Sequence, residues 1–326
     1  MTPSGSTDER GAALIHVAPS PHIKDAAAHT QRIMTDVILA LLPIIALSIY
    51  LFEVYAIKQL SICVVACMGS EFLFVKMRGK SLTLKDCSAV VTGIIIALSL
   101  PGSAPWFVGV LASVVAIGIG KIIFGGLGMN IFNPAMVGRA FVMIAFAQLL
   151  GAASYENVTG LVDAVSGATP LSALKFNGVS METAALFWGM TNGSLGETSS
   201  AACLLGGLFL VFRKTASWQI PAGILLSVVL IAGITDIAGS HSGLLLVHHL
   251  FGGALMFGAF FIATDPVTSP LTPRGKWIFG LGTGFLIMII RLFSGYPEGV
   301  MFAVLMMNAV TPLINRWTNP LPMGEA

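Results

Sequence analysis

Long, nearly uncharged apolar stretches most constrain what this 326-residue chain can fold into. Apolar residues make up 56% of the sequence and charged residues only 10%. Several stretches are long enough to cross a hydrocarbon core of about 30 Å, where helices satisfy every backbone hydrogen bond internally. The sequence therefore predicts an all-α polytopic membrane protein. About ten transmembrane helices are expected, at residues 36–57, 59–76, 87–100, 104–124, 136–153, 198–213, 218–238, 244–264, 275–293 and 297–317.

The basic residues predict the orientation of these helices. If the N-terminus is cytoplasmic, fourteen of the 17 lysines and arginines lie inside, and only Lys58, Lys175 and Arg291 lie outside. This bias follows the positive-inside rule, so both termini are expected to be cytoplasmic. The expected parts are an N-terminal segment at 1–35, a five-helix membrane repeat at 36–153, an outward-facing loop at 154–197, a second five-helix repeat at 198–317 and a C-terminal tail at 318–326.

A weak internal similarity predicts that the two halves are inverted repeats. The run from Lys121 to Met136 is echoed by the run from Ile290 to Ala309. With five helices in each half, the second half would cross the membrane in the opposite sense to the first. Such proteins usually place their working site between the halves, on interrupted helices.

The outward loop contains the motif Ser166-Gly167-Ala168-Thr169-Pro170-Leu171. Thr169 suits a helix N-cap and Pro170 the first helical position, so a capped helix start is the simpler interpretation. The alternative is that the threonine hydroxyl carries a chemical group. A helix N-terminus would favour a phosphate at that position.

A glycine- and asparagine-rich stretch, Gly125–Ala135, forms the second distinctive motif. Asn130 and Asn133 place amide groups at membrane depth, where unsatisfied polar groups are costly. The stretch could be a loop that caps a helix, or a pocket whose amides bind a flavin ring or a quinone. The nearby Arg139 is expected to extend to the inner surface, and its alternative role is to pair with a phosphate or carboxylate.

The other polar residues give weaker indications. Glu71, Asp236 and Asp265 are ion-pathway candidates, because carboxylates within membranes often mark cation routes. No metal site is predicted, since the four cysteines are expected to be small buried residues. Two adjacent histidines, His248 and His249, point in different directions on a helix and cannot bind one heme from both faces.

Together these motifs resemble the D subunit of the Rnf ion-translocating oxidoreductase complex, a relative of the B subunit of the sodium-pumping NADH:quinone reductase. The resemblance rests on Ser20–His22, Gly125–Phe141, Ser166–Leu171 and Ala263–Pro270, in the expected order over most of the chain. The short N-terminal region is more similar to that of the Rnf protein.

The resemblance implies that Thr169 carries FMN through a phosphoester, with Ser166, Gly167 and Ala168 completing the attachment motif. A separate flavin transferase would attach it. The resemblance also implies a second, noncovalent flavin, riboflavin, which we expect near Asn130 and Asn133.

The function implied is that of a membrane subunit, not catalytic alone, in a complex of the bacterial inner membrane. Such a complex moves electrons between ferredoxin and NAD and translocates Na⁺ or H⁺. The expected partners are other Rnf subunits, including an outward-facing flavin subunit, and membrane lipid, with no nucleic acid. One alternative is the quinone-reducing subunit of the sodium pump. Another is a non-redox channel or transporter, since Asn133-Pro134-Ala135 and the less complete Asn308-Ala309 resemble the paired half-helices of water channels.

Overall fold

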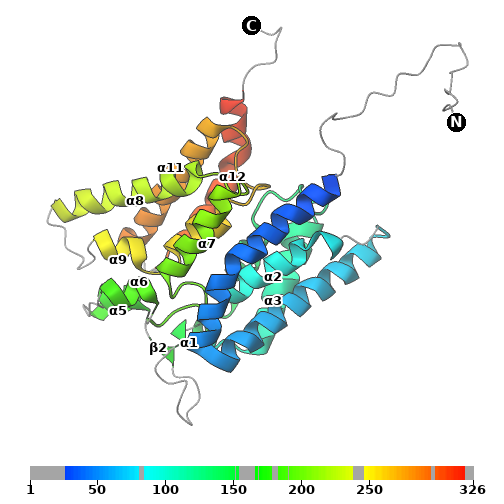
Figure 1. Ribbon diagram of the computed structural model, residues 1–326, viewed down its shortest axis with the longest axis horizontal. Coiled ribbons are helices and arrows are strands. Elements are labelled where there is room, and N and C mark those ends of the chain that lie inside the picture. The colour runs from blue at the N-terminus through cyan, green and yellow to red at the C-terminus, as the bar shows by residue number, and fades with distance from the viewer. Residues whose placement is uncertain are drawn as a thin grey trace, which may run out of the picture.

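The computed structural model describes residues 26–80, 84–150, 152–153, 166–167, 169–177, 183–189, 191–237, 246–294 and 298–319. Over these ranges the regular structure is helical apart from one pair of two-residue strands and an isolated bridge between Pro101 and Ser194 (Figure 1), which confirms the predicted all-α class. Large apolar side chains such as those of Phe212, Ile237 and Phe293 are exposed. Among the described residues, four helical stretches are long and apolar enough to cross a membrane, namely Thr30–Met77, Gln219–Ile237, Pro273–Phe293 and Val300–Thr318. These features agree with a membrane protein.

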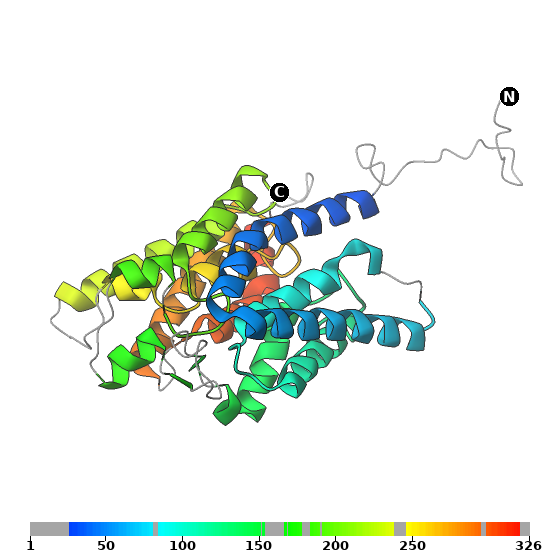
Figure 2. The same cartoon turned by 60° about the horizontal axis from the view of Figure 1, so that its bottom comes forward.

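The first long element, α1 (Ala26–Met77), consists of two helices joined at a sharp break. Glu53 at the break has φ 46° and ψ −122°, and the chain reverses its direction there, so that the two limbs form a V (Figures 1 and 2). The sequence predicts the break near Lys58, which instead lies inside the second limb. Between Asp36 and Glu71 the charged residues are Glu53 and Lys58, and the break lies at the first of them.

The helices that follow α1 pack against its two limbs and against each other. After the short turn η1 (Leu84–Asp86), α2 (Ser88–Ser99) and α3 (Trp106–Ile117) both contact α1. The last turn of α3 continues as a π-helix, η2 (Gly118–Ile122), and α4 (Pro134–Ala145) packs against α3. A single 3₁₀ turn, η3 (Ala147–Leu149), follows α4.

The segment between the two halves carries the Thr169 motif. Strand β1 (Ala152–Ala153) pairs antiparallel with β2 (Ser166–Gly167). Two short helices, α5 (Pro170–Asn177) and α6 (Thr183–Trp188), follow. In Figure 1 they lie at the end of the bundle opposite the start of α1.

The second half contains α7 (Ser200–Phe212), α8 (Gln219–Ile237), α9 (Leu246–Phe251), α10 (Leu255–Phe257), a second π-helix η4 (Gly258–Ile262), α11 (Pro273–Phe293) and α12 (Val300–Thr318). Helices α8 and α11 pack against each other, and α12 packs against α11. The halves meet where α1 contacts α7 and where α4 contacts α12. At the first of these contacts Gly206 lies against the backbone of Ala40, so α1 and α7 approach closely.

Candidate functional site

Thr169 forms the N-cap of α5, as the sequence predicts. Its side-chain oxygen accepts a hydrogen bond from the backbone N–H of Ser172 at 3.2 Å and lies 2.7 Å from the Ser172 hydroxyl. Its carbonyl accepts from the backbone N–H of Ala173 at 2.8 Å. The hydroxyl is only partly buried, so a chemical group could reach it. Of the other motif residues, Ser166 and Gly167 form β2, and Ala168 lies outside the described residues.

A small cavity borders Thr169 and is lined by two acidic residues, Glu197 and Glu298. Its volume is about 230 Å³, including its open mouth. Gly253 also lines it, with a φ of +68°, and a Cβ there would lie 3.0 Å from a carboxylate oxygen of Glu298. A ring system attached at Thr169 would have to extend beyond this cavity.

Arg139 connects the two carboxylates that line this cavity. Its guanidinium lies 2.8 Å from Glu197 and 3.5 Å from Glu298. The expectation that Arg139 reaches the inner surface is therefore wrong, because its side chain is only 11% exposed and faces acidic groups near the Thr169 motif. The alternative, that it pairs with a carboxylate, is the one observed, with side chains of the protein as its partners.

Glu298 lies in the connection between α11 and α12 and holds a proton more strongly than an ordinary glutamate. Burial, and then the neighbouring Glu197 carboxylate, raise its pKa to about 8, and Arg139 opposes this rise. Near neutral pH the Glu298 carboxyl therefore carries a proton beside Arg139.

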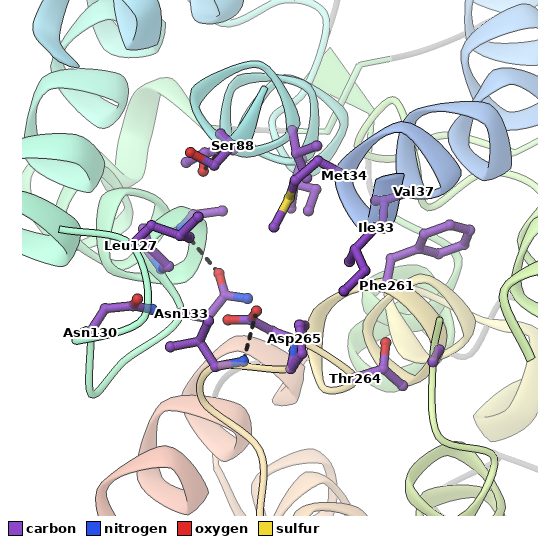
Figure 3. A pocket seen from close by; sticks show the side chains of 18 of the residues that line it. Ile33, Met34, Val37, Ser88, Leu127, Asn130, Asn133, Phe261, Thr264 and Asp265 are labelled. Carbon is purple, nitrogen blue, oxygen red and sulfur yellow. Dashed lines mark hydrogen bonds between the residues drawn. The ribbon is translucent and has the colours of Figure 1, made fainter. Parts of the chain in front are cut away.

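The larger cavity lies between the two halves and holds about 750 Å³, including its open mouth. In Figure 3, Asn133 and Asp265 project toward each other in its middle. Most of its wall is apolar. The polar or charged residues in the wall are Ser88, Thr92, Lys121, Asn130, Asn133, Thr215, Thr264 and Asp265.

Asn133 uses its side chain and backbone to join the halves. Its side-chain oxygen caps α4 by accepting from the backbone N–H groups of Ala135 and Met136 at 3.0 and 3.3 Å. Its amide nitrogen donates to the carbonyl of Ile262 at 3.3 Å, and its backbone N–H donates to the side chain of Asn308 at 3.1 Å. The predicted capping role is confirmed, and these groups already have partners inside the protein.

Asn130 presents a polar atom to the larger cavity. Its amide nitrogen donates to the carbonyl of Phe132 at 3.2 Å. Its side-chain oxygen is buried without a hydrogen-bond partner among the described residues, and the whole residue is 6% exposed. Since an unpaired buried acceptor is unfavourable, this oxygen could accept a hydrogen bond from a ligand.

The three carboxylate candidates have different surroundings. Glu71 is fully buried and forms an ion pair with Lys121, whose Nζ lies 2.8 Å from its carboxylate. Asp265 lies in the larger cavity and accepts hydrogen bonds from the Thr268 hydroxyl at 3.0 Å and the backbone N–H of Val267 at 3.4 Å. Asp236 accepts from the backbone N–H of Leu246 at 3.3 Å, so it links the end of α8 to the start of α9. The structure brings none of the three together.

Sequence reasoning missed the roles of Lys121, Glu197 and Glu298. The charge bias places Lys121 at the inner surface, yet its side chain is 2% exposed. The two glutamates meet Arg139 only through the fold, since 159 residues separate Arg139 from Glu298. Lys121 and Arg291 are both buried cations, but the internal similarity pairs Lys121 with Ile290 and so does not mark them as a pair.

The water-channel alternative is not supported by the position of Asn308. Asn133 caps the start of α4, as a half-helix requires, but Asn308 lies in the middle of α12. The second copy of the motif, Asn308-Ala309, therefore does not begin a half-helix.

Known proteins similar to this chain share one family and similar names. Residues 16–324 match the model of the NQR2, RnfD, RnfE family. The chain is 42% identical over 306 residues to the D subunit of the Na(+)-translocating ferredoxin:NAD(+) oxidoreductase complex of Acetobacterium woodii, with 93% of each chain covered. It is 40% identical over 324 residues to the D subunit of the proton-translocating ferredoxin:NAD(+) oxidoreductase complex of Clostridium ljungdahlii, with 95% and 96% covered. It is 37% identical over 349 residues to the D subunit of the ion-translocating oxidoreductase complex of Actinobacillus succinogenes, with 95% and 98% covered.

Proposed function

The chain belongs to the NQR2, RnfD, RnfE family, and we propose that it is the D subunit of an Rnf-type complex of the bacterial inner membrane. The complex transfers electrons between ferredoxin and NAD and couples this transfer to Na⁺ or H⁺ translocation. The names of the Acetobacterium and Clostridium relatives support this reaction and differ in the ion. The subunit is not catalytic alone. Its partners are the other Rnf subunits, including an outward-facing flavin subunit, and membrane lipid.

Thr169 is the residue that bears FMN, through a phosphoester formed by a flavin transferase. One observation carries this assignment: the partly buried Thr169 hydroxyl caps α5 at the edge of a small cavity. The N-terminal end of a helix attracts negative charge. When bound, the flavin supplies electron transfer, and the protein supplies position and electrostatics.

The charged residues around Thr169 fit a tethered phosphate. Two ionised carboxylates would repel it, but Arg139 neutralises part of their charge and Glu298 holds a proton near neutral pH. A protonated Glu298 carboxyl can donate a hydrogen bond to a phosphate oxygen, whereas an ionised one cannot. Thr169 thus fixes the position of the phosphate, and Arg139 and Glu298 keep its surroundings from becoming too negative.

The larger cavity holds the second, noncovalent flavin, which we assign as riboflavin. Its position between the two halves and its largely apolar wall suit a flat ring system. The side-chain oxygen of Asn130 would accept a hydrogen bond from the ring. Asn133 holds the cavity wall together, because its own polar groups are already bonded within the protein.

The fold is a pair of inverted five-helix repeats with ten transmembrane segments and cytoplasmic termini. The two membrane repeats are residues 36–153 and 198–317, with the outward-facing loop at 154–197 between them. In Figure 1, α1 begins and α12 ends at one end of the bundle, and α5 and α6 lie at the other, which supports this topology. A reporter fused after Lys175 tests it, and cytoplasmic activity of that reporter would refute the outward placement of Thr169.

In-gel flavin fluorescence after denaturation tests the attachment at Thr169. The wild-type subunit, produced together with its flavin transferase, is expected to fluoresce, and Thr169→Ala is expected to lose the signal. Ser172→Ala is the matched control, since it removes the hydroxyl 2.7 Å from that of Thr169 but leaves the attachment oxygen in place. Fluorescence that persists in Thr169→Ala would refute the assignment.

A further inference from the structure

Lys121 and Glu71 form a buried ion pair at the wall of the larger cavity, and we propose that the charge of Lys121, held in place by Glu71, raises the reduction potential of the redox-active ring bound there. This inference rests on the proposed function of that cavity. In this arrangement Lys121 supplies a fixed positive charge beside the ring, and Glu71 is the counter-ion that holds Lys121 in place. Glu71 is then part of the electrostatic surroundings of the ring, in addition to being a candidate for the ion route.

The geometry places the cation between the cavity and the carboxylate. The Nζ of Lys121 donates to Glu71 at 2.8 Å and to the Ser88 hydroxyl at 2.6 Å. Lys121 and Ser88 both line the cavity, and Glu71 does not. The lysine side chain is 2% exposed and the glutamate side chain 1%. The cavity therefore borders the residue that carries the positive charge and does not border the one that carries the negative charge.

The backbone around Lys121 supports a dedicated role. Lys121 lies in the π-helix η2, and π-helical turns are rare and occur frequently at functional sites. Just before it, a Cβ at Gly120 would lie 2.9 Å from the Cα of Pro134. This close approach holds η2 against the start of α4. Lys121 is thus anchored by both its side chain and its backbone.

Stability alone does not explain why a buried ion pair is present at this position. Removing two charges from water costs several kcal/mol for each ion, and well-packed apolar residues of similar volume often stabilise a protein as well or better. A fixed charge beside a redox centre provides such a reason. A ring that gains an electron becomes more negative, and a nearby cation stabilises that form strongly where water and salt screen little.

The other polar groups of the cavity complete this arrangement. Asn130 offers its unpaired side-chain oxygen as a hydrogen-bond acceptor, which would orient a ring carrying an N–H donor. Asp265 also lines the cavity, and its carboxylate is held by Thr268 and by the backbone of Val267. Lys121 is therefore the charged group that favours reduction of the ring, whereas Asp265 opposes it.

The test is a potentiometric titration of the noncovalent flavin in the purified complex. Lys121→Met and Lys121→Gln are expected to decrease the equilibrium constant for its reduction at least tenfold, which is about 59 mV for a one-electron couple. Lys121→Arg keeps the charge and is expected to stay within about threefold of wild type. Lys121→Gln is the variant to compare if the methionine variant loses its flavin. The double variant Lys121→Met with Glu71→Gln is expected to recover part of the loss.

Lys276→Met is the matched control, because Lys276 donates to Ser217 at 2.6 Å and does not line the cavity. An unchanged potential in a neutral Lys121 variant that retains flavin would overturn the inference. So would an equal shift in Lys121→Arg, since packing rather than charge would then be responsible. Extraction and chromatography of the noncovalent flavin distinguish a failure of this inference from a failure of the proposed function. A wild-type complex with no such flavin would refute the assignment of the cavity itself.

Discussion

The backbone N–H of Asn133 donates a hydrogen bond of 3.1 Å to the side chain of Asn308, 175 residues further along the chain. Asn308 in turn donates to the carbonyl of Thr268 at 3.2 Å. One side chain of α12 thus connects the start of α4 to the segment after η4. Both connected segments border the larger cavity, so this contact determines how its two sides are positioned.

Replacing Asn308 with leucine should destabilise the subunit by about 1–3 kcal/mol, because the N–H of Asn133 would be left buried without a partner. Thermal unfolding of the purified complex in detergent measures the loss. Asn315→Leu, on the same helix, is the control, since its side chain accepts from an exposed N–H of Leu271, which water can satisfy. Equal effects of the two substitutions would contradict the role of Asn308.

Replacing Arg139 with methionine should destabilise the subunit by about 3–5 kcal/mol, because the buried Glu197 carboxylate would lose the cation that lies 2.8 Å from it. Adding Glu197→Gln and Glu298→Gln should restore much of the loss. Arg213→Met removes the ion pair with Asp36, but the Arg213 side chain is 43% exposed, so the expected cost is about 1 kcal/mol or less. Thermal unfolding compares the three variants, and similar losses in Arg139→Met and Arg213→Met would count against the buried network.

The stability of the subunit should fall as the pH rises toward 8. The pKa of Glu298 is about 8 in the folded chain and its ordinary value is 4.5, so between these values the folded state binds more protons than the unfolded state. Stability therefore decreases with pH in this window and levels off above it. Melting temperatures from about pH 5 to pH 9 should show a steeper fall in wild type than in Glu298→Gln, and parallel curves would refute the raised pKa.

Replacing Gly206 with alanine should separate α1 from α7. A Cβ at Gly206 would overlap the carbonyl oxygen of Ala40 and the ring of Phe261, and overpacking of this kind costs about 1–3 kcal/mol. Gly233→Ala in α8 is the matched control, because a Cβ there meets nothing within 4 Å. That substitution should be neutral or stabilising by about 0.5–1 kcal/mol, as measured by thermal unfolding.

Local signals in the sequence predicted the helical elements and two of their caps. Thr169 followed by Pro170, and Asn133 followed by Pro134, begin helices in the structure as expected, because capping depends on neighbouring residues. The partners of Arg139 could not be predicted in this way. The fold brings Glu197 and Glu298 to it from distant parts of the chain, and no local pattern encodes such contacts.

The positive-inside rule describes a bias over many residues but fails for single buried cations. It places Lys121 and Arg139 at the inner surface, whereas each forms an ion pair inside the protein. The sequence also leaves open whether Asn130 and Asn133 form a cap or a pocket. They do both: Asn133 caps α4, and both residues line the larger cavity.

The reversal of chain direction at Glu53 limits where residues can be inserted into or deleted from this protein. A single non-helical residue joins the two limbs of α1, so the connection has no slack to absorb an added or deleted amino acid. An insertion would rotate one limb by about 100° about its axis, because a helix has about 3.6 residues per turn. The second limb carries Glu71, which such a rotation would turn away from Lys121. Substitutions can accumulate in α1, but insertions and deletions between Glu53 and Glu71 should be eliminated by selection.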